Sequence, residues 1–212
     1  MLVPENDIAR VADAHERLLG AIAGLTDADV RQVSLLPTWS VGHVLTHLAR
    51  NADSHVRRVR AAGRGEVVDQ YPGGNAARDA EIEIGSGRPA AQIIEDVRQT
   101  ALAVDEAWKH VTHGGWLGRT RDASGLERPL FELPSRRWQE VEVHLVDLGI
   151  GVTHRDWSDD FVLQWLPRTR EHMWEKSPPQ TRGLTFDSPA DELAWFYGRL
   201  QGDDYPALPP WG

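Results

Sequence analysis

Four long stretches of this sequence repeat apolar residues at the 3.6-residue period of an α-helix. They cover residues 6–23, 41–62, 89–111 and 133–149. Ser40 is a natural N-cap, Pro89 fits a first helical turn, and Gly149 is a natural stop. Because amphipathic helices of this length bury their apolar stripes against one another, the pattern predicts a four-helix bundle over residues 1–151.

Shorter segments connect these helices. We expect a single helical turn after Thr26 and a shorter helix over residues 76–84. Residues 63–75 contain four glycines and a proline, which predicts a loop long enough to form the rim of a pocket. Two turn signals, GG and SG, within residues 113–130 favour either a small hairpin or an ordered loop.

The pattern changes after residue 151. We expect a helix over residues 158–175, a short strand at GLTF (residues 183–186) and a last helix capped by Ser188. Residues 152–212 are therefore predicted to form a small C-terminal α/β region. The predicted fold class is mainly α, with a four-helix bundle as the main domain.

The composition limits the chemistry that such a bundle can carry. The 212 residues include no cysteine, which excludes disulfides, thiolate metal ligands and a protein thiol nucleophile. A net charge of −9 gives no general attraction to nucleic acid or anionic lipid. The apolar runs are too short to span a membrane, and the N-terminus lacks a basic and apolar leader pattern, so we expect a cytoplasmic protein. A metal ion here would have to be held by His, Asp or Glu.

The helix predicted over residues 133–149 carries a polar stripe with apolar residues on both sides. At 100° per residue, Glu140, His144 and Asp147 fall within about 60° of one another. Because apolar side chains flank this stripe on both sides, it is predicted to face inward. Glu142 lies nearly opposite and is predicted to face solvent.

A buried carboxylate beside a buried imidazole is costly unless something satisfies both groups. A hydrogen bond between Glu140 and His144, or water in a hydrated groove, would do so, and these are the simplest interpretations of the pair. A metal ion would do so as well, with Asp147 placed to orient an imidazole from behind. The spacing alone is compatible with each of these.

The helix over residues 41–62 offers a further ligand. His43, His47 and Asn51 lie at the edge of its apolar face, and His55 lies closer to the centre. Periodicity does not choose among the three histidines. One of them would complete a site of two imidazoles and one carboxylate with open positions, as in catalytic zinc and non-haem iron sites. Without cysteine the set favours Zn²⁺, and it is compatible with Fe²⁺, Ni²⁺, Co²⁺ and Mn²⁺.

Three blocks of the sequence carry a family resemblance. They are LPTWSVGHVLTHLARNAD, NAARDAEIEIGSG and SRRWQEVEVHLVDLGIG. In this order and at these separations they resemble the mycothiol-dependent maleylpyruvate isomerase family, within the DinB-like metal-binding helical bundles. The resemblance implies a DinB-like four-helix bundle that binds a divalent metal, usually taken as zinc, at His47, Glu140 and His144.

The resemblance also implies roles for other residues. Asp147, which follows the Glu-x-x-x-His pair, and Arg78, in the middle block, match positions that we assign to catalysis. Arg199, in FYGRLQG, resembles an arginine implicated in thiol binding, and we assign it to both catalysis and thiol binding. We expect Asn51, one turn after His47, to contact the thiol as well. Arg78 and Arg199 are predicted to bind substrate carboxylates, because a guanidinium matches a carboxylate in two bonds.

The activity that the resemblance implies is the cis–trans isomerisation of maleylpyruvate to fumarylpyruvate, assisted by mycothiol. Addition of a thiolate makes the double bond transiently single, rotation follows, and elimination returns the trans product. Because the chain has no cysteine, the thiol must be a separate small molecule. Two alternatives stay open. One is a mycothiol S-transferase acting on an electrophilic metabolite or drug; the other is a non-enzymatic metal-binding bundle closed by a fourth ligand, with His43 the nearest candidate.

Overall fold

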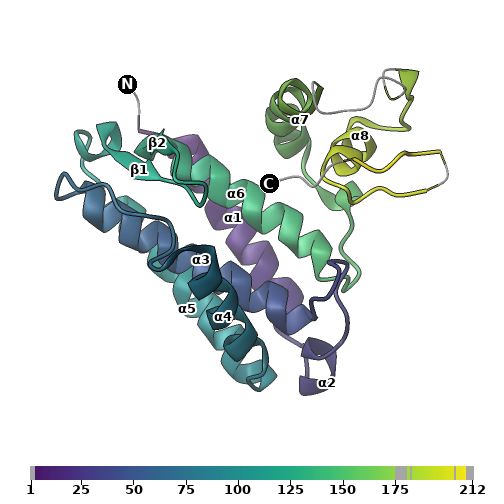
Figure 1. The fold of residues 1–212 in the computed structure, drawn as a ribbon, viewed down its shortest axis with the longest axis horizontal. Helices are drawn as coiled ribbons and strands as arrows, with labels where there is room; N and C mark the ends of the chain where they lie inside the picture. Colours follow the sequence, from purple (N-terminus) through teal and green to yellow (C-terminus); the bar gives the residue numbers. More distant parts are fainter. Residues whose placement is uncertain (1–2, 175–180, 182, 203, 209–212) are drawn as a thin grey trace. The chain divides into compact units, whose positions relative to one another are not determined.

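The structure, a computed structural model, describes residues 3–174, 181, 183–202 and 204–208 of the chain (Figure 1). The chain divides into two compact units, residues 1–150 and residues 151–212. Among the described residues, no helix combines the length and the apolar character that crossing a membrane requires.

The first unit is built on four long helices. They are α1 (Glu5–Ile22), α3 (Val41–Ala62), α5 (Ala90–Lys109) and α6 (Leu133–Asp147). α3 packs against α5 and α6, and α1 packs against the same two helices, so the four form a closed ring (Figure 1). Fully buried aliphatic side chains from all four, such as Leu18, Leu48, Val97 and Val141, fill its centre. The predicted four-helix bundle is confirmed.

Local sequence signals set the ends of these helices. The Ser40 hydroxyl accepts a hydrogen bond from the backbone N–H of His43, and the His43 ring accepts one from the backbone N–H of Ser40. Gly149 follows α6 with a φ of +67°, a left-handed conformation that favours glycine. All four helices begin and end within two residues of their predicted bounds.

Two shorter helices complete the helical part of this unit. They are α2 (Asp27–Val30), capped by Thr26, and α4 (Gly74–Ser86), which is two residues longer at each end than predicted. α4 packs on α3, and two glycines allow a close approach. A Cβ at Gly42 would lie 2.9 Å from the Ser86 carbonyl oxygen, and one at Gly85 would overlap the methyl group of Thr46. A larger residue at either position would push α4 away from α3.

A small hairpin precedes α6. Its strands, β1 (Arg119–Arg121) and β2 (Glu127–Pro129), are antiparallel, with Thr120 opposite Arg128. The Asp122 carboxylate accepts hydrogen bonds from the backbone N–H groups of Ser124 and Leu126, which fixes the turn. Of the two predicted alternatives, hairpin or ordered loop, the hairpin is the one formed.

The second unit contains two α-helices among its described residues. They are α7 (Asp159–Trp174) and α8 (Pro189–Phe196), preceded by a turn of 3₁₀-helix, η3 (His154–Asp156). Ser188 caps α8 as predicted, by accepting a hydrogen bond from the backbone N–H of Asp191. The ring of Trp157 packs against those of Phe161 and Tyr197 and forms the centre of this unit. Glu175, the predicted end of the first of these helices, lies outside the described residues.

The strand predicted at GLTF is not formed. Residues 184–186 are not in a strand, and the β pairing described in this unit is an isolated bridge between Gly202 and Tyr205. A strand needs a partner to satisfy its backbone, and GLTF has none among the described residues. Instead, the Phe186 ring stacks on that of Tyr205 and packs against Trp195, so its apolar side chain is half-buried without a sheet.

Candidate metal centre

One side chain of α3 and two of α6 meet at one point. They are His47, Glu140 and His144; each offers one ligand atom, and these atoms lie within 4.8 Å of one another. Nε2 of His47 lies 2.7 Å from Oε1 of Glu140, and Nε2 of His144 lies 3.6 Å from the same oxygen. We refer to these three side chains as the trio. The structure thus brings together the three residues that were predicted as metal ligands.

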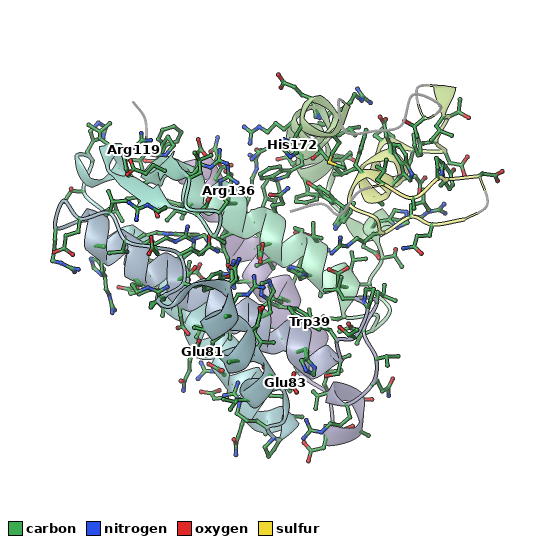
Figure 2. The ribbon with its side chains drawn as sticks, viewed as in Figure 1. Trp39, Glu81, Glu83, Arg119, Arg136 and His172 are labelled. Carbon is green, nitrogen blue, oxygen red and sulfur yellow. The ribbon has the colours of Figure 1, made fainter. Side chains whose placement is uncertain are left out.

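The fold positions the trio through helical spacing and one contact between helices. Glu140 and His144 are four residues apart on α6 and therefore project from successive turns of one face. His47 reaches them from α3, where the rings of His47 and His144 meet edge to face with centroids 4.7 Å apart. Trp39, just before α3, places its ring 5.5 Å from that of His47 (Figure 2). Packing against Trp39 and His144 therefore holds the His47 ring.

Asp147 orients one of the imidazoles. Its side chain is buried, and Oδ2 lies 2.8 Å from Nδ1 of His144. A carboxylate at Nδ1 directs the other ring nitrogen, Nε2, toward Glu140 and fixes the ring. Nδ1 of His47 has no comparable partner among the described residues and is buried without a hydrogen bond.

Burial and hydrogen bonding set the charges of the trio. Burial lowers the pKa of His47, although its hydrogen bond to Glu140 opposes this effect. Burial would raise the pKa of Glu140, but hydrogen bonds from His144 and His47 outweigh it and hold that pKa well below its usual range. Burial would lower the pKa of His144, but the carboxylates of Asp147 and Glu140 outweigh this effect and raise that pKa to about 9. Without a bound cation, the trio at neutral pH therefore contains a carboxylate, an imidazolium and a neutral imidazole.

The other two histidines of α3 lie apart from the trio. Nδ1 of His43 is 2.7 Å from the Ser40 hydroxyl, and its Nε2 is 3.2 Å from both Glu83 (labelled in Figure 2) and Ser86 of α4. His55 is buried with its ring against Trp108. His43 thus caps α3 and joins it to α4, and it is not among the side chains gathered around Glu140.

A buried arginine of α6, which sequence reasoning missed, lies next to the trio. Arg137 is fully buried and donates hydrogen bonds to Nε2 of His15 (3.1 Å), to the Leu48 carbonyl (2.9 Å) and to Oδ1 of Asn51 (2.9 Å). It therefore ties α6 to α1 and α3 one turn before Glu140. Asn51, predicted to contact a thiol, has its side-chain oxygen committed to Arg137.

Tyr71 is a second residue that sequence reasoning missed. It lies in the loop before α4 and is buried, which raises the pKa of its hydroxyl group, and the nearby Asn51 side chain opposes this shift. The Arg78 guanidinium lies 5.4 Å from the centre of the Tyr71 ring and 2.6 Å from the Asp79 carboxylate. Arg78 also contributes to lowering the pKa of His47, which places its charge near the trio. A lone tyrosine in a glycine-rich loop was the only sequence signal for the contact between Tyr71 and Arg78.

The prediction that Glu142 faces solvent is wrong. Its side chain is 3% exposed, and both of its oxygens accept hydrogen bonds from Nη1 of Arg17 on α1, at 2.8 and 2.9 Å. α6 packs against α1 on this side and against α3 on the other, so both faces of the helix are covered. Burial raises the pKa of Glu142, and Arg17 opposes the shift. A helical wheel of α6 alone cannot show that a second helix supplies a cation.

Arg199 belongs to the second unit. It follows α8, and its guanidinium donates a hydrogen bond to the Tyr197 carbonyl oxygen. Its backbone N–H donates one to the Ala194 carbonyl oxygen. Gly198, with a φ of +74°, makes the turn that precedes it. These contacts hold Arg199 within its own unit.

The fold and the trio together define a DinB-like helical bundle with a site of two histidines and one carboxylate. The family model for the mycothiol maleylpyruvate isomerase N-terminal domain matches residues 11–149, which contain all three members of the trio. The chain belongs to this family, as the sequence blocks indicated.

Comparisons with solved structures agree with this assignment of the fold. The chain matches the crystal structure of the mycothiol-dependent maleylpyruvate isomerase with a TM-score of 0.86 and 22% sequence identity, over 99% of this chain and 98% of that one. A mutant of that isomerase, with one histidine changed to alanine, matches with a TM-score of 0.86 and 21% identity over the same shares. A comparison with curated proteins gave no match.

Proposed function

We propose that this chain is a metal- and mycothiol-dependent cis–trans isomerase of the maleylpyruvate type. The observation that carries the proposal is the trio, in which α3 and α6 bring ligand atoms of two histidines and one glutamate within 4.8 Å. Membership of the mycothiol maleylpyruvate isomerase family supports the choice of reaction and thiol.

The residues present fit a divalent cation. Three nitrogen and oxygen donors converge, and Asp147 orients His144, as carboxylates commonly do for histidine ligands. The absence of sulfur donors favours Zn²⁺. When bound, such a cation would supply Lewis acidity and lower the pKa of a coordinated thiol, so that more of it is thiolate at neutral pH.

The chain's own residues hold this arrangement in place before any ligand binds. Arg137 fixes α6 to α3 through the Leu48 carbonyl and Asn51, and Asp147 fixes the His144 ring. The Asn51 side chain accepts a hydrogen bond from Arg137 and is better suited to this support than to thiol contact. Donors that are already oriented lose less entropy when a ligand binds.

The proposed reaction needs no net change in the thiol. The thiolate sulfur forms a bond to one alkene carbon, and the π electrons move onto the conjugated carbonyl oxygen. The former double bond is then single and rotates. The electrons return, the carbon–sulfur bond breaks, and the thiolate leaves with the trans product formed.

Cations are required because the substrate is a dianion and the chain carries a net charge of −9. Arg78 is our candidate for binding one carboxylate, since the Tyr71 ring holds its guanidinium near the trio. Arg199 of the second unit is our candidate for thiol binding. Its assignment rests on the resemblance of FYGRLQG to the family.

The test is metal analysis of the purified protein combined with a maleylpyruvate assay, with and without mycothiol. We expect bound zinc and isomerisation that requires both zinc and thiol. His47→Ala should remove metal and activity together, whereas His110→Ala, at an exposed histidine of the first unit, should change neither. Zinc without isomerisation of maleylpyruvate would contradict the proposed substrate.

Free thiol measured during turnover separates the alternatives. An isomerase regenerates its thiol, whereas an S-transferase consumes one thiol for each electrophile. A non-enzymatic bundle would show neither behaviour, and no thiol would alter the spectrum of a Co²⁺-substituted sample. The position of His43, bonded to Ser40 and α4, argues against a site closed by this histidine.

A further inference from the structure

One face of α3 carries a row of buried polar side chains. His47, Asn51, Ser54 and Arg58 follow one another at spacings of three and four residues and therefore share one face of the helix. The first two contact side chains of α6. The proposed metal site uses only His47, so the far end of the row has no assigned role.

Arg58, at that far end, is a buried cation without a carboxylate partner among the described residues. The residue is 4% exposed, and its side chain donates to Ser54: from Nε to the carbonyl oxygen and from Nη2 to the hydroxyl, both 3.2 Å. Neither bond uses Nη1. Burial lowers the pKa of Arg58 to about 10, which still leaves it charged at neutral pH. A buried charge of this kind is unfavourable unless an opposite charge meets it.

The groups around Arg58 do not supply that opposite charge. Arg57 adds positive charge near it. Arg136, at the start of α6 (Figure 2), does so as well, but it is itself paired with Glu132 at 3.1 Å. Asp122 is the nearby acid, and its carboxylate is already bonded to Arg128 at 2.9 Å and to the hairpin turn. Tyr71 is neutral at pH 7, because the usual pKa of a tyrosine is about 10 and burial raises it further. This end of the row therefore has a surplus of positive charge in a chain that is acidic as a whole.

The spacing along α3 relates Arg58 to the trio. The hydrogen bonds from Arg58 to Ser54 direct the Arg58 guanidinium along the helix toward His47, back by one helical turn. Ser54 is seven residues after His47, which at 1.5 Å per residue places the guanidinium about 10 Å along the helix from the His47 level. Seven residues also complete nearly two turns, so both groups lie on the same face. A small dicarboxylate bound at its two ends can span this separation.

We propose that Arg58 is an anion-binding site, which holds one carboxylate of a small dicarboxylate while the remainder of that ligand lies toward His47. The identity of the ligand as the electrophilic substrate rests on the proposed function. The anion site itself depends only on the charge and burial of Arg58. It adds a second carboxylate contact to the one proposed for Arg78.

The test uses maleate as the probe and the full-length chain, with affinity measured by isothermal titration calorimetry. We expect Arg58→Met to weaken maleate binding at least tenfold and Arg58→Gln, which can still bond to Ser54, to do the same. Arg60→Met is the matched control, because it removes the same charge from an exposed position of the same helix, and it should leave the affinity unchanged. Higher salt should weaken binding to the wild type.

Thermal unfolding distinguishes a binding role from a structural one. Removing an uncompensated buried charge should leave the melting temperature of Arg58→Met unchanged or raise it when no anion is present. A lower melting temperature together with unchanged maleate affinity in Arg58→Gln would assign Arg58 to structure and overturn the proposal. So would an absence of maleate binding to the wild type, or a tenfold loss in Arg78→Met with none in the Arg58 variants.

The same measurement in a His47→Ala background separates this inference from the proposed function. If Arg58→Gln still weakens maleate binding there, the anion site exists independently of the trio. That result would stand even if the chain failed to isomerise maleylpyruvate. Turnover of maleylpyruvate by an Arg58→Gln variant with unchanged maleate affinity would overturn the anion site and leave the proposed function intact.

Discussion

Oδ2 of Asp147 lies 2.8 Å from Nδ1 of His144, three residues earlier on α6. This buried contact holds the ring so that its other nitrogen turns toward Glu140. The negative charge of Asp147 also keeps the His144 ring basic. A side chain outside the trio thereby controls the geometry of the site.

Asp147→Asn should weaken metal binding without preventing folding. The amide keeps the shape of the carboxylate but removes its charge, and loss of such a partner typically costs roughly 10- to 100-fold in metal affinity. Competition with a chelator measures the change. Asp13→Asn, at an exposed position of α1, is the control and should have no effect. Equal zinc affinity in Asp147→Asn and wild type would show that Asp147 does not support His144 in this way.

Arg17→Met should destabilise the bundle because it removes the cation that faces the buried Glu142. We expect the free energy of unfolding to fall by about 1–3 kcal/mol, the cost of leaving a buried polar group poorly satisfied. The double variant Arg17→Met with Glu142→Gln should recover part of this loss, since the charge is then gone as well. Urea denaturation of the wild type, the two single variants and the double variant gives the coupling energy between the two side chains. Strictly additive losses would mean that the two side chains do not stabilise each other.

Stability should fall as the pH drops below about 6.5. Burial lowers the pKa of His15 and places that of His55 well below its usual value. Below pH 6.5 the unfolded chain therefore binds protons that these two folded histidines do not, and each contributes a slope of up to about 1.4 kcal/mol per pH unit until its folded pKa is reached. Unfolding measured at pH 7.5, 6.5 and 5.5 gives the slope. Replacing His55 with Leu should make it shallower, and an identical slope in that variant would contradict the assignment.

Gly42→Ala should reduce stability, because the new methyl group would meet the Ser86 carbonyl oxygen at 2.9 Å. Overpacking of this kind costs about 1–3 kcal/mol. Gly20→Ala, inside α1 with nothing within 4 Å of the new methyl group, is the matched control and should raise stability by about 0.4–1 kcal/mol. Thermal unfolding of both variants checks the pair. If both changes were stabilising, the contact between α3 and α4 would be looser than described.

The sequence predicted the parts of the molecule that depend on local signals. Caps such as Ser40 and stops such as Gly149 placed the long helices within two residues, and the four-residue spacing of Glu140 and His144 predicted that they act together. Periodicity did not select His47 from three histidines; the family resemblance was needed for that. Local spacing describes one helix at a time, and the choice depends on which face of α3 meets α6.

The residues that sequence reasoning missed all depend on contacts between elements. Arg137 and Glu142 are polar residues of α6 whose burial is compensated by side chains of other helices. The position of Tyr71 depends on the path of the loop before α4. Arg58 stands out only because no carboxylate pairs with it among the described residues. The strand predicted at GLTF failed for the same reason, because a strand forms only where a neighbouring strand can pair with its backbone.

His47 and Glu140 are separated by 93 residues of chain, yet their side chains are 2.7 Å apart. An ion held by both would behave as a removable cross-link, joining the early and late parts of the bundle and closing a long loop of the polypeptide. Loading of the site and assembly of the bundle would then be linked equilibria. Metal bound during synthesis would therefore add to the stability of the folded state.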